Sequence, residues 1–153
     1  MSRRYPERPV VGVGAIILEG DKVLLVERGN EPLKGVWSIP GGALELGESL
    51  AEGVRREARE ELGLAVEVGE LVEVFERITR DAEGRVEYHY VLADYLCTVT
   101  GGTLRASDDA ADARWVGRSE LAALALTAGT ARVIEKAFQL RDAAAVQRVK
   151  TDD

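Results

Sequence analysis

The chain has 153 residues, 46% of them hydrophobic and 31% charged, with a formal net charge of -7 at pH 7. This length and composition suit one globular domain with its own core, so we expect a single domain over residues 1–153, with flexible ends at 1–8 and 149–153. The acidic balance argues against a long nucleic acid as partner, and an anionic substrate would need a bound cation or well-placed arginines.

Compartment and membrane association are limited by the cysteine count and by the N-terminal stretch. The sole cysteine, Cys97, excludes an internal disulfide and a Cys-based zinc cluster, and it fits a reducing cytoplasm. Basic residues precede an apolar run near the start, but prolines and charges interrupt it and no small-residue cleavage site follows. No other stretch approaches membrane-spanning length. We therefore expect a soluble cytoplasmic protein without a membrane partner.

The first predicted element is a β-hairpin. Residues 10–18 are mostly β-branched or small, and a turn at 19–22 leads into a second apolar run at 23–27. The "GVGAII" motif inside the first strand lacks the third glycine and the following helix of a dinucleotide fingerprint, so we reject that interpretation. After a loop, residues 36–39 form a short strand that Pro40 and two glycines end.

An acidic segment follows and predicts a helix with three carboxylates on one face. Ser49 and Glu52 have the spacing of a capping box, and Gly63 suits the C′ position, so the helix should lie between them. Its apolar stripe would consist of Leu50, Val54, Ala58 and Leu62. At ~100° per residue, the side chains beside the stripe fall within one arc of roughly 100°. They are Glu57, Glu60 and Glu61.

This arrangement of charges favours a metal site over a purely structural helix. Like charges three or four residues apart repel by a few tenths of a kcal/mol each. A hard divalent cation would reverse the sign of that interaction, because Mg²⁺ takes oxygen ligands and keeps waters that substrate phosphates can replace. The glycine pair Gly41 and Gly42 leads into the helix and lets backbone groups approach a ligand closely.

The second half of the chain predicts another hairpin and more helix. Residues 66–80 and 86–99 are long β-rich runs joined by a turn-forming tip. The second run is apolar on both faces, which predicts a central strand. Next come a short strand at 113–116 and a short helix capped by Ser119.

The last predicted element is a helix over residues 130–140. Apolar content falls after Leu140, so we expect the tail to fray. Strands and helices mix along the chain without regular βαβ alternation, which predicts an α/β fold with a mixed β-sheet.

The stretch from Gly42 to Leu64 resembles the Nudix box of the Nudix hydrolases. The residues that meet the pattern are Gly42, Glu48, Arg56, Glu57, Glu60, Glu61, Gly63 and Leu64. Ala58 departs from it, because the family usually has a larger aliphatic residue there. The flanks "VLLVERG", "WSIPGG" and "ARWV" are also similar to the family. The resemblance implies a Nudix-type α/β/α sandwich with a mixed β-sheet.

The resemblance also implies a metal-dependent hydrolase that acts on a small nucleotide. The implied Mg²⁺ or Mn²⁺ ligands are Glu57, Glu60, Glu61 and the Gly41 carbonyl. Arg56 would pair with Glu48 and brace the loop against the helix. Water would attack the pyrophosphate bond of a nucleoside diphosphate linked to another moiety, with ADP-ribose as the leading candidate.

Two other functions stay open at this point. One is a sanitising pyrophosphohydrolase for nucleoside triphosphates such as 8-oxo-dGTP, and the other is a non-catalytic nucleotide-sensing domain. Non-catalytic relatives would be expected to lose box glutamates, and this chain has lost none. All four prolines lie at or before Pro40, so none follows the box where many ADP-ribose hydrolases have one. Residues 66–98 could supply a base pocket or the intersubunit surface of a homodimer.

Outside the box, only a few side chains are candidates for the site. Arg28 ends the second strand, where similar proteins often place a phosphate-contacting cation, although a solvated loop arginine is an equal interpretation. We include Arg28 with Gly41 and Gly42 as substrate-binding residues. The base that activates water could be Glu61 or a carboxylate of the "SDDAAD" loop, namely Asp108, Asp109 or Asp112.

Overall fold

The computed structural model describes residues 3–30, 33–107 and 110–152. In chain order its elements are β1 (Val10–Glu19), β2 (Lys22–Arg28), β3 (Trp37–Ser38), β4 (Gly41–Ala43), α1 (Leu50–Leu62), β5 (Leu64–Arg80), β6 (Val86–Gly102), β7 (Ala110–Gly117), the 3-10 helix η1 (Arg118–Ala123) and α2 (Thr130–Asp152).

The strands form one mixed sheet. Its order is β3-β2-β1-β6-β5, with β4 paired to β1 and β7 paired to β2. β1 and β6 run parallel, whereas β1 is antiparallel to both β2 and β4. β6 lies between β1 and β5, which confirms the central strand predicted from its two apolar faces. The predicted α/β class with a mixed sheet is therefore correct.

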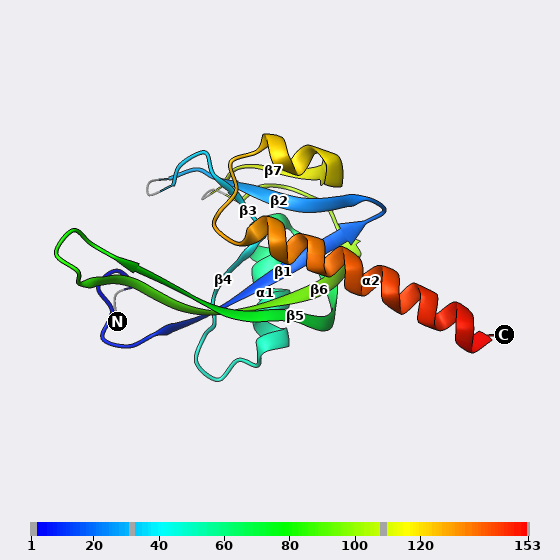
Figure 1. Cartoon of the computed structure of the whole chain (residues 1–153), viewed down its shortest axis with the longest axis horizontal. Coiled ribbons are helices and arrows are strands. Elements are labelled where there is room, and N and C mark those ends of the chain that lie inside the picture. The colour runs from blue at the N-terminus through cyan, green and yellow to red at the C-terminus, as the bar shows by residue number, and fades with distance from the viewer. Residues whose placement is uncertain (1–2, 31–32, 108–109, 153) are drawn as a thin grey trace.

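Helices cover both faces of this sheet, which gives the α/β/α sandwich (Figure 1). Side chains alternate along β1, so that Val13, Ala15 and Ile17 pack in one core with the apolar stripe of α1. Ile16 and Leu18 belong to the second core, which includes the buried face of α2. Ala58 is fully buried in the α1 core, so the smaller residue at this position packs against the sheet.

Both ends of α1 are set by residues that the sequence pointed to. The Glu52 backbone N–H donates to Ser49 Oγ at 3.1 Å, and Gly63 ends the helix with φ 70°. Only half of the capping box is present, because the Glu52 side chain has no hydrogen-bond partner within the described part of the chain. The helix therefore begins and ends where its sequence predicted.

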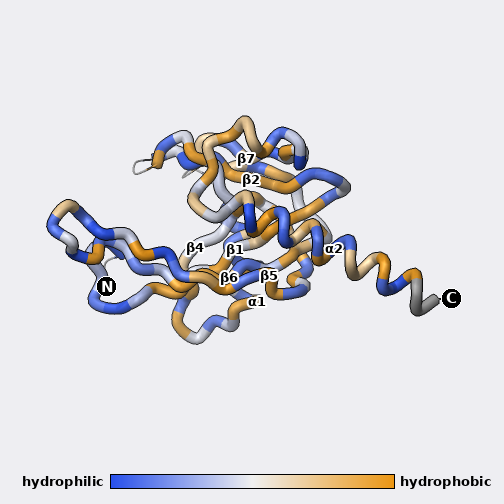
Figure 2. The backbone as a smooth tube through the Cα atoms, in the orientation of Figure 1, coloured by the Kyte–Doolittle hydropathy of each residue, from blue (hydrophilic) through white to orange (hydrophobic). Residues whose placement is uncertain are grey.

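Other elements differ from their predictions. The two glycines that the sequence predicts to end the strand at 36–39 form a further strand, because Gly41 and Gly42 pair with β1. Ser119 does not cap η1, whose N-cap is Gly117 without a side-chain hydrogen bond. The predicted fraying after Leu140 is wrong, since α2 continues to Asp152, and Figure 2 shows polar and apolar residues alternating along that extension. Three consecutive alanines, 143–145, favour helix there without burial.

The β5–β6 hairpin projects well beyond the sandwich (Figure 1). Near the N-terminus, the Tyr5 N–H donates to the Glu87 carbonyl at 2.7 Å and the Tyr5 hydroxyl donates to Asp81 at 2.8 Å. Residues near the chain start thus contact the hairpin, while the flexibility expected for 1–8 and 149–153 stays a prediction. No helix within the described ranges is long and apolar enough to cross a membrane.

Candidate active site

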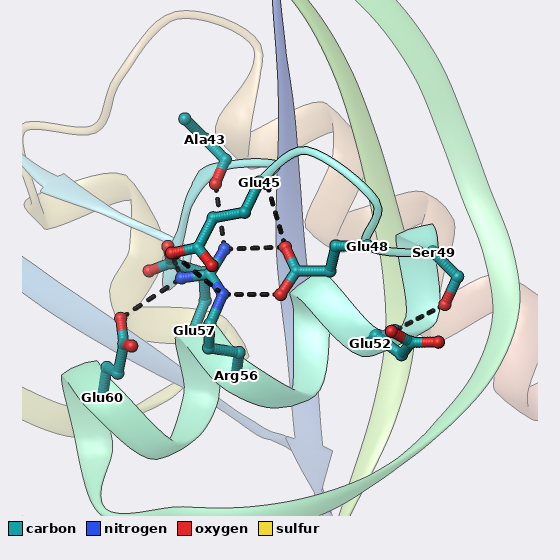
Figure 3. Close-up of polar contacts among 8 residues, drawn as sticks. All are labelled: Ala43, Glu45, Glu48, Ser49, Glu52, Arg56, Glu57 and Glu60. Carbon is teal, nitrogen blue, oxygen red and sulfur yellow. Dashed lines mark hydrogen bonds and ion pairs between the residues drawn. The ribbon is translucent and has the colours of Figure 1, made fainter.

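Arg56 is the centre of a polar network on α1 (Figure 3). Its guanidinium donates from Nε to Glu48 Oε2 at 2.6 Å and from Nη2 to Glu48 Oε1 at 2.9 Å. Nη2 also donates to the Ala43 carbonyl at 3.0 Å. Such a two-point contact fixes orientation as well as distance. The Arg56–Glu48 pair expected from the resemblance is therefore present, and it ties α1 to the loop before it.

This ion pair changes the titration of both partners. The hydrogen bonds from Arg56, with one from the Glu45 backbone N–H, lower the pKa of Glu48 to about 2. The same contacts raise the pKa of Arg56 above its ordinary value, against a smaller opposing effect of burial. The pair thus stays ionised across the neutral range.

Two of the three predicted carboxylates converge on one nitrogen of Arg56. Its Nη1 donates to Glu57 Oε1 at 2.8 Å and to Glu60 Oε2 at 3.2 Å. The Glu57 side chain is 13% exposed, whereas that of Glu60 is 60% exposed. Glu57 is therefore fixed between the helix and the loop, and Glu60 is free to change rotamer towards solvent.

The glycine backbone of β4 lies directly against the carboxylates. Gly41 donates its N–H to Glu61 Oε2 at 3.1 Å. A Cβ atom at Gly42 would lie 2.5 Å from Glu57 Oε1, so only glycine leaves room for that carboxylate. The structure therefore brings Gly41, Gly42, Glu57 and Glu61 together, as the sequence predicted for residues 15 to 20 positions apart.

The donor chemistry of this cluster fits a hard divalent cation. Every candidate donor is an oxygen, and Glu57 and Glu60 already place one carboxylate oxygen each around a single cationic atom, Arg56 Nη1. In the described part of the chain, however, no three Asp, Glu, His or Cys side chains are spaced as a ready-made metal site. Rotation of the exposed Glu60 side chain would be needed to bring a third carboxylate into place.

A pocket of about 360 Å³ opens beside β4. Its walls come from β1, β4, the β5–β6 hairpin and the start of α2, and Gly41, Gly42 and Ala43 are among its lining residues. Arg3, Arg28 and Arg77 also line it. These guanidinium groups give an acidic protein a local cationic surface that suits phosphate groups.

Asp94 is the pocket residue that the sequence reasoning missed. It lies on β6, is only 5% exposed, and is the one carboxylate among the described residues that line the pocket. Burial raises the pKa of Asp94 from 3.8 to about 6; nearby Arg77 opposes this rise and Glu73 adds to it. A signal was available, because Asp94 interrupts the apolar face formed by Leu92 and Leu96.

The remaining candidates have different positions. Arg28 is exposed and lines the pocket. Asp112 lies on β7 with its carboxylate 3.7 Å from Arg114, whereas Asp108 and Asp109 lie outside the described residues. Burial raises the pKa of the Cys97 thiol to about 12, in keeping with a packed apolar role.

Comparisons with known proteins extend over most of the chain. The NUDIX domain model matches residues 8–137. The ADP-ribose pyrophosphatase of Methanocaldococcus jannaschii is 39% identical over 117 residues, which cover 76% of this chain and 67% of that protein. Human 8-oxo-dGDP phosphatase NUDT18 is 31% identical over 138 residues, covering 88% of this chain and 40% of that protein.

The fold is also shared with solved structures. The crystal structure of a MutT NUDIX hydrolase from Burkholderia pseudomallei matches with a TM-score of 0.75 and 33% identity, covering 85% of this chain and 98% of that one. The similarity therefore holds for sequence and architecture alike.

Proposed function

The chain belongs to the Nudix hydrolase family, and from this premise we propose that it cleaves the pyrophosphate bond of a nucleoside diphosphate linked to another moiety, with ADP-ribose or a similar nucleoside diphosphate sugar as substrate. The proposal gives the acidic face of α1 the role of binding Mg²⁺ or Mn²⁺, and the neighbouring pocket the role of binding the nucleotide.

One observation carries this proposal: β4 contacts both parts of the site. Its two glycines touch Glu57 and Glu61 of α1, and these glycines together with Ala43 line the pocket that holds the arginines. A nucleotide in the pocket would therefore have its phosphates within reach of both the cationic side chains and the carboxylates. That proximity is what cleavage of a phosphoanhydride needs, because positioning and charge stabilisation provide most of the catalysis.

Each group of residues at the site has its own role in the proposed reaction. Glu57, Glu60 and Glu61, with the Gly41 carbonyl, would hold the cation, which when bound neutralises phosphate charge and stabilises the transition state. Arg56 and Glu48 keep the β4–α1 loop in place through their two-point ion pair. Arg28 and Arg77 would contact the phosphates from the pocket side. Gly42 leaves room for the Glu57 carboxylate beside β4.

The substrate class is supported by the similarity to the archaeal ADP-ribose pyrophosphatase, which extends over two thirds of that protein. A second candidate is an oxidised purine nucleoside diphosphate, suggested by the 31% identity to NUDT18, of which the chain spans less than half. We rank it second because the matched region of NUDT18 is the smaller part of that protein.

A substrate panel tests the proposal. The purified protein is incubated with Mg²⁺ and, separately, ADP-ribose, other nucleoside diphosphate sugars, 8-oxo-dGDP and 8-oxo-dGTP, and the products are identified by mass spectrometry. We expect AMP and ribose 5-phosphate from ADP-ribose, with a higher kcat/KM than for the oxidised nucleotides. A preference for 8-oxo-dGDP would favour the second candidate, and turnover of none of these compounds would contradict both.

A further inference from the structure

Four side chains from one face of β6 line the pocket: Tyr88, Tyr90, Leu92 and Asp94. The first three are aromatic or aliphatic, and the Tyr88 and Tyr90 rings lie nearly parallel with their centroids 6.2 Å apart. Phe75, which pairs with Leu92 across β5 and β6, continues the same wall. Flat apolar surface of this kind suits the face of a nucleobase. The Asp94 carboxylate is the last of the four β6 side chains along the strand.

Two glycines on β1 leave space for the pocket-lining side chains of β6. In the parallel register, Gly12 is paired with Leu92 and Gly14 with Asp94. A Cβ at Gly12 would lie 2.7 Å from Leu92 Cδ2, and a Cβ at Gly14 would collide with Asp94 Oδ1 and lie 2.8 Å from Ile39 Cδ1. The "GVG" segment, which has no dinucleotide fingerprint, therefore makes room for the Asp94 carboxylate.

The Asp94 carboxylate has no hydrogen-bond donor among the residues that the structure describes. Its two charged neighbours are engaged elsewhere. Arg77 Nη2 donates to the Ala128 carbonyl at 2.8 Å, and Glu73 pairs with Arg132 at 2.6 Å. A carboxylate on a residue that is only 5% exposed, with no donor from the described residues, depends on the pocket for its hydrogen bonds. A ligand in the pocket that supplies N–H groups would provide them.

We propose that Asp94 determines base specificity by accepting a hydrogen bond from the exocyclic amine of the substrate's nucleobase. The inference rests on the proposed function, since it takes the pocket as the nucleotide site. An ionised carboxylate only accepts hydrogen bonds, and adenine, cytosine and guanine each present an amine. Hypoxanthine and uracil present a carbonyl oxygen at the matching position, which would face the carboxylate unfavourably. With a pKa of about 6, Asp94 is ionised at pH 7.5.

Binding of nucleoside monophosphates tests this proposal without turnover, because these ligands contain no pyrophosphate bond. Calorimetry at pH 7.5 compares AMP with IMP and CMP with UMP, two pairs in which the exocyclic amine becomes a carbonyl and the adjacent ring nitrogen gains a hydrogen. Wild-type protein should prefer the amine in at least one pair by ~10-fold or more, as expected for a hydrogen bond to a charged group. Asp94→Asn should lose or reverse this preference, because an amide also donates to a carbonyl.

A matched control shows whether the effect of Asp94→Asn depends on its position in the pocket or only on the loss of one negative charge. Asp21→Asn makes the same exchange in the exposed turn between β1 and β2, outside the pocket lining, and should keep the wild-type preference. Equal affinities within both pairs for wild-type protein, or no binding of any of the four at millimolar concentration, would overturn the proposal. So would an Asp94→Asn protein that keeps the wild-type preference for the amine.

The outcomes also separate this inference from the proposed function. Amine preference in binding without cleavage of any nucleoside diphosphate derivative would support Asp94 as the specificity residue and reject the reaction. Cleavage with no effect of Asp94→Asn on base preference would support the reaction and reject the inference.

Discussion

Among the glutamates of α1, the degree of burial and the hydrogen-bond partners predict different mutational effects. Glu57→Gln should lower kcat by at least ~10²-fold, because it removes one of the anionic metal ligands that we propose. It should also lower the Tm of the metal-free protein, since Glu57 accepts a short hydrogen bond from Arg56 in a mostly buried position. The measurements are kcat at saturating Mg²⁺ and the Tm in EDTA.

Glu52→Gln is the control on the same helix. Its side chain makes no hydrogen bond or ion pair with another described residue, so both kcat and Tm should stay close to wild type. A Glu57→Gln protein with near wild-type kcat would show that the site does not lie on this face of α1.

Asp94 gives the protein a pH dependence opposite in sign to that of Glu48. Because its folded pKa of about 6 exceeds the ordinary 3.8, the folded state binds the proton more tightly, so stability falls as pH rises from about 4 to 6. At about 1.4 kcal/mol per pH unit, the difference amounts to about 3 kcal/mol. Of the two charged groups that face Asp94, Arg77 and Glu73, the second is paired with Arg132, which holds the pKa of Glu73 below its ordinary value.

Asp94→Asn cannot titrate and should lack this contribution. Urea unfolding at pH 4, 5, 6 and 7 should therefore show the variant gaining stability relative to wild type as pH rises, with the change complete near pH 7. Parallel pH profiles for the two proteins would mean that Asp94 is not desolvated in the folded state.

Residue patterns predicted the local part of the site and missed the long-range part. The three glutamates share one helix, so 100° per residue suffices to group them. Asp94 becomes a pocket residue only because β6 pairs with β1 in a register that sets it opposite Gly14. That pairing joins segments about eighty residues apart, which no short pattern in the sequence specifies.

At the scale of elements, α1 is defined by its two caps, and the N-cap can be tested alone. Ser49→Ala removes the side-chain oxygen that accepts the Glu52 N–H, which should cost about 1 kcal/mol and lower the Tm by roughly 2–4 °C. The substrate KM should not change, because Ser49 lies at the far end of α1 from Glu60 and Glu61. Ser49→Asp, which restores an acceptor, should recover the Tm; a loss that Asp does not recover would contradict the capping role.

Secondary-structure elements could be predicted where neighbouring residues determine them. They were missed where pairing with a distant strand determines them. The caps of α1 and the alternation in β1 act within a few residues. The two glycines of β4 are typical of a turn by residue type, but pairing with β1 makes this segment a strand. α2 extends past its apolar spacing because alanines sustain a helix without a buried face.

For the whole molecule, net charge makes a cation necessary to the proposed reaction. A chain of net charge -7 has to bind an anionic diphosphate, and only Arg3, Arg28 and Arg77 among the described pocket-lining residues carry a positive charge. The carboxylates on α1 would repel the phosphates unless a cation lies between them. Excess EDTA should therefore abolish activity, and Mg²⁺ or Mn²⁺ should restore it.

Stability provides a readout of the same site that does not depend on turnover. Binding of a cation to the folded state alone stabilises it by about 2.7 kcal/mol at a hundred times Kd, so Mg²⁺ should raise the wild-type Tm by several degrees. The double variant Glu57→Gln/Glu61→Gln should show no such rise, whereas Glu52→Gln should respond as wild type does. Calorimetric scans with Mg²⁺, Ca²⁺ and EDTA would separate specific binding from general screening, because screening would raise the Tm of all three proteins alike. Full activity in EDTA together with a Tm that Mg²⁺ does not change would remove the metal from the proposed reaction.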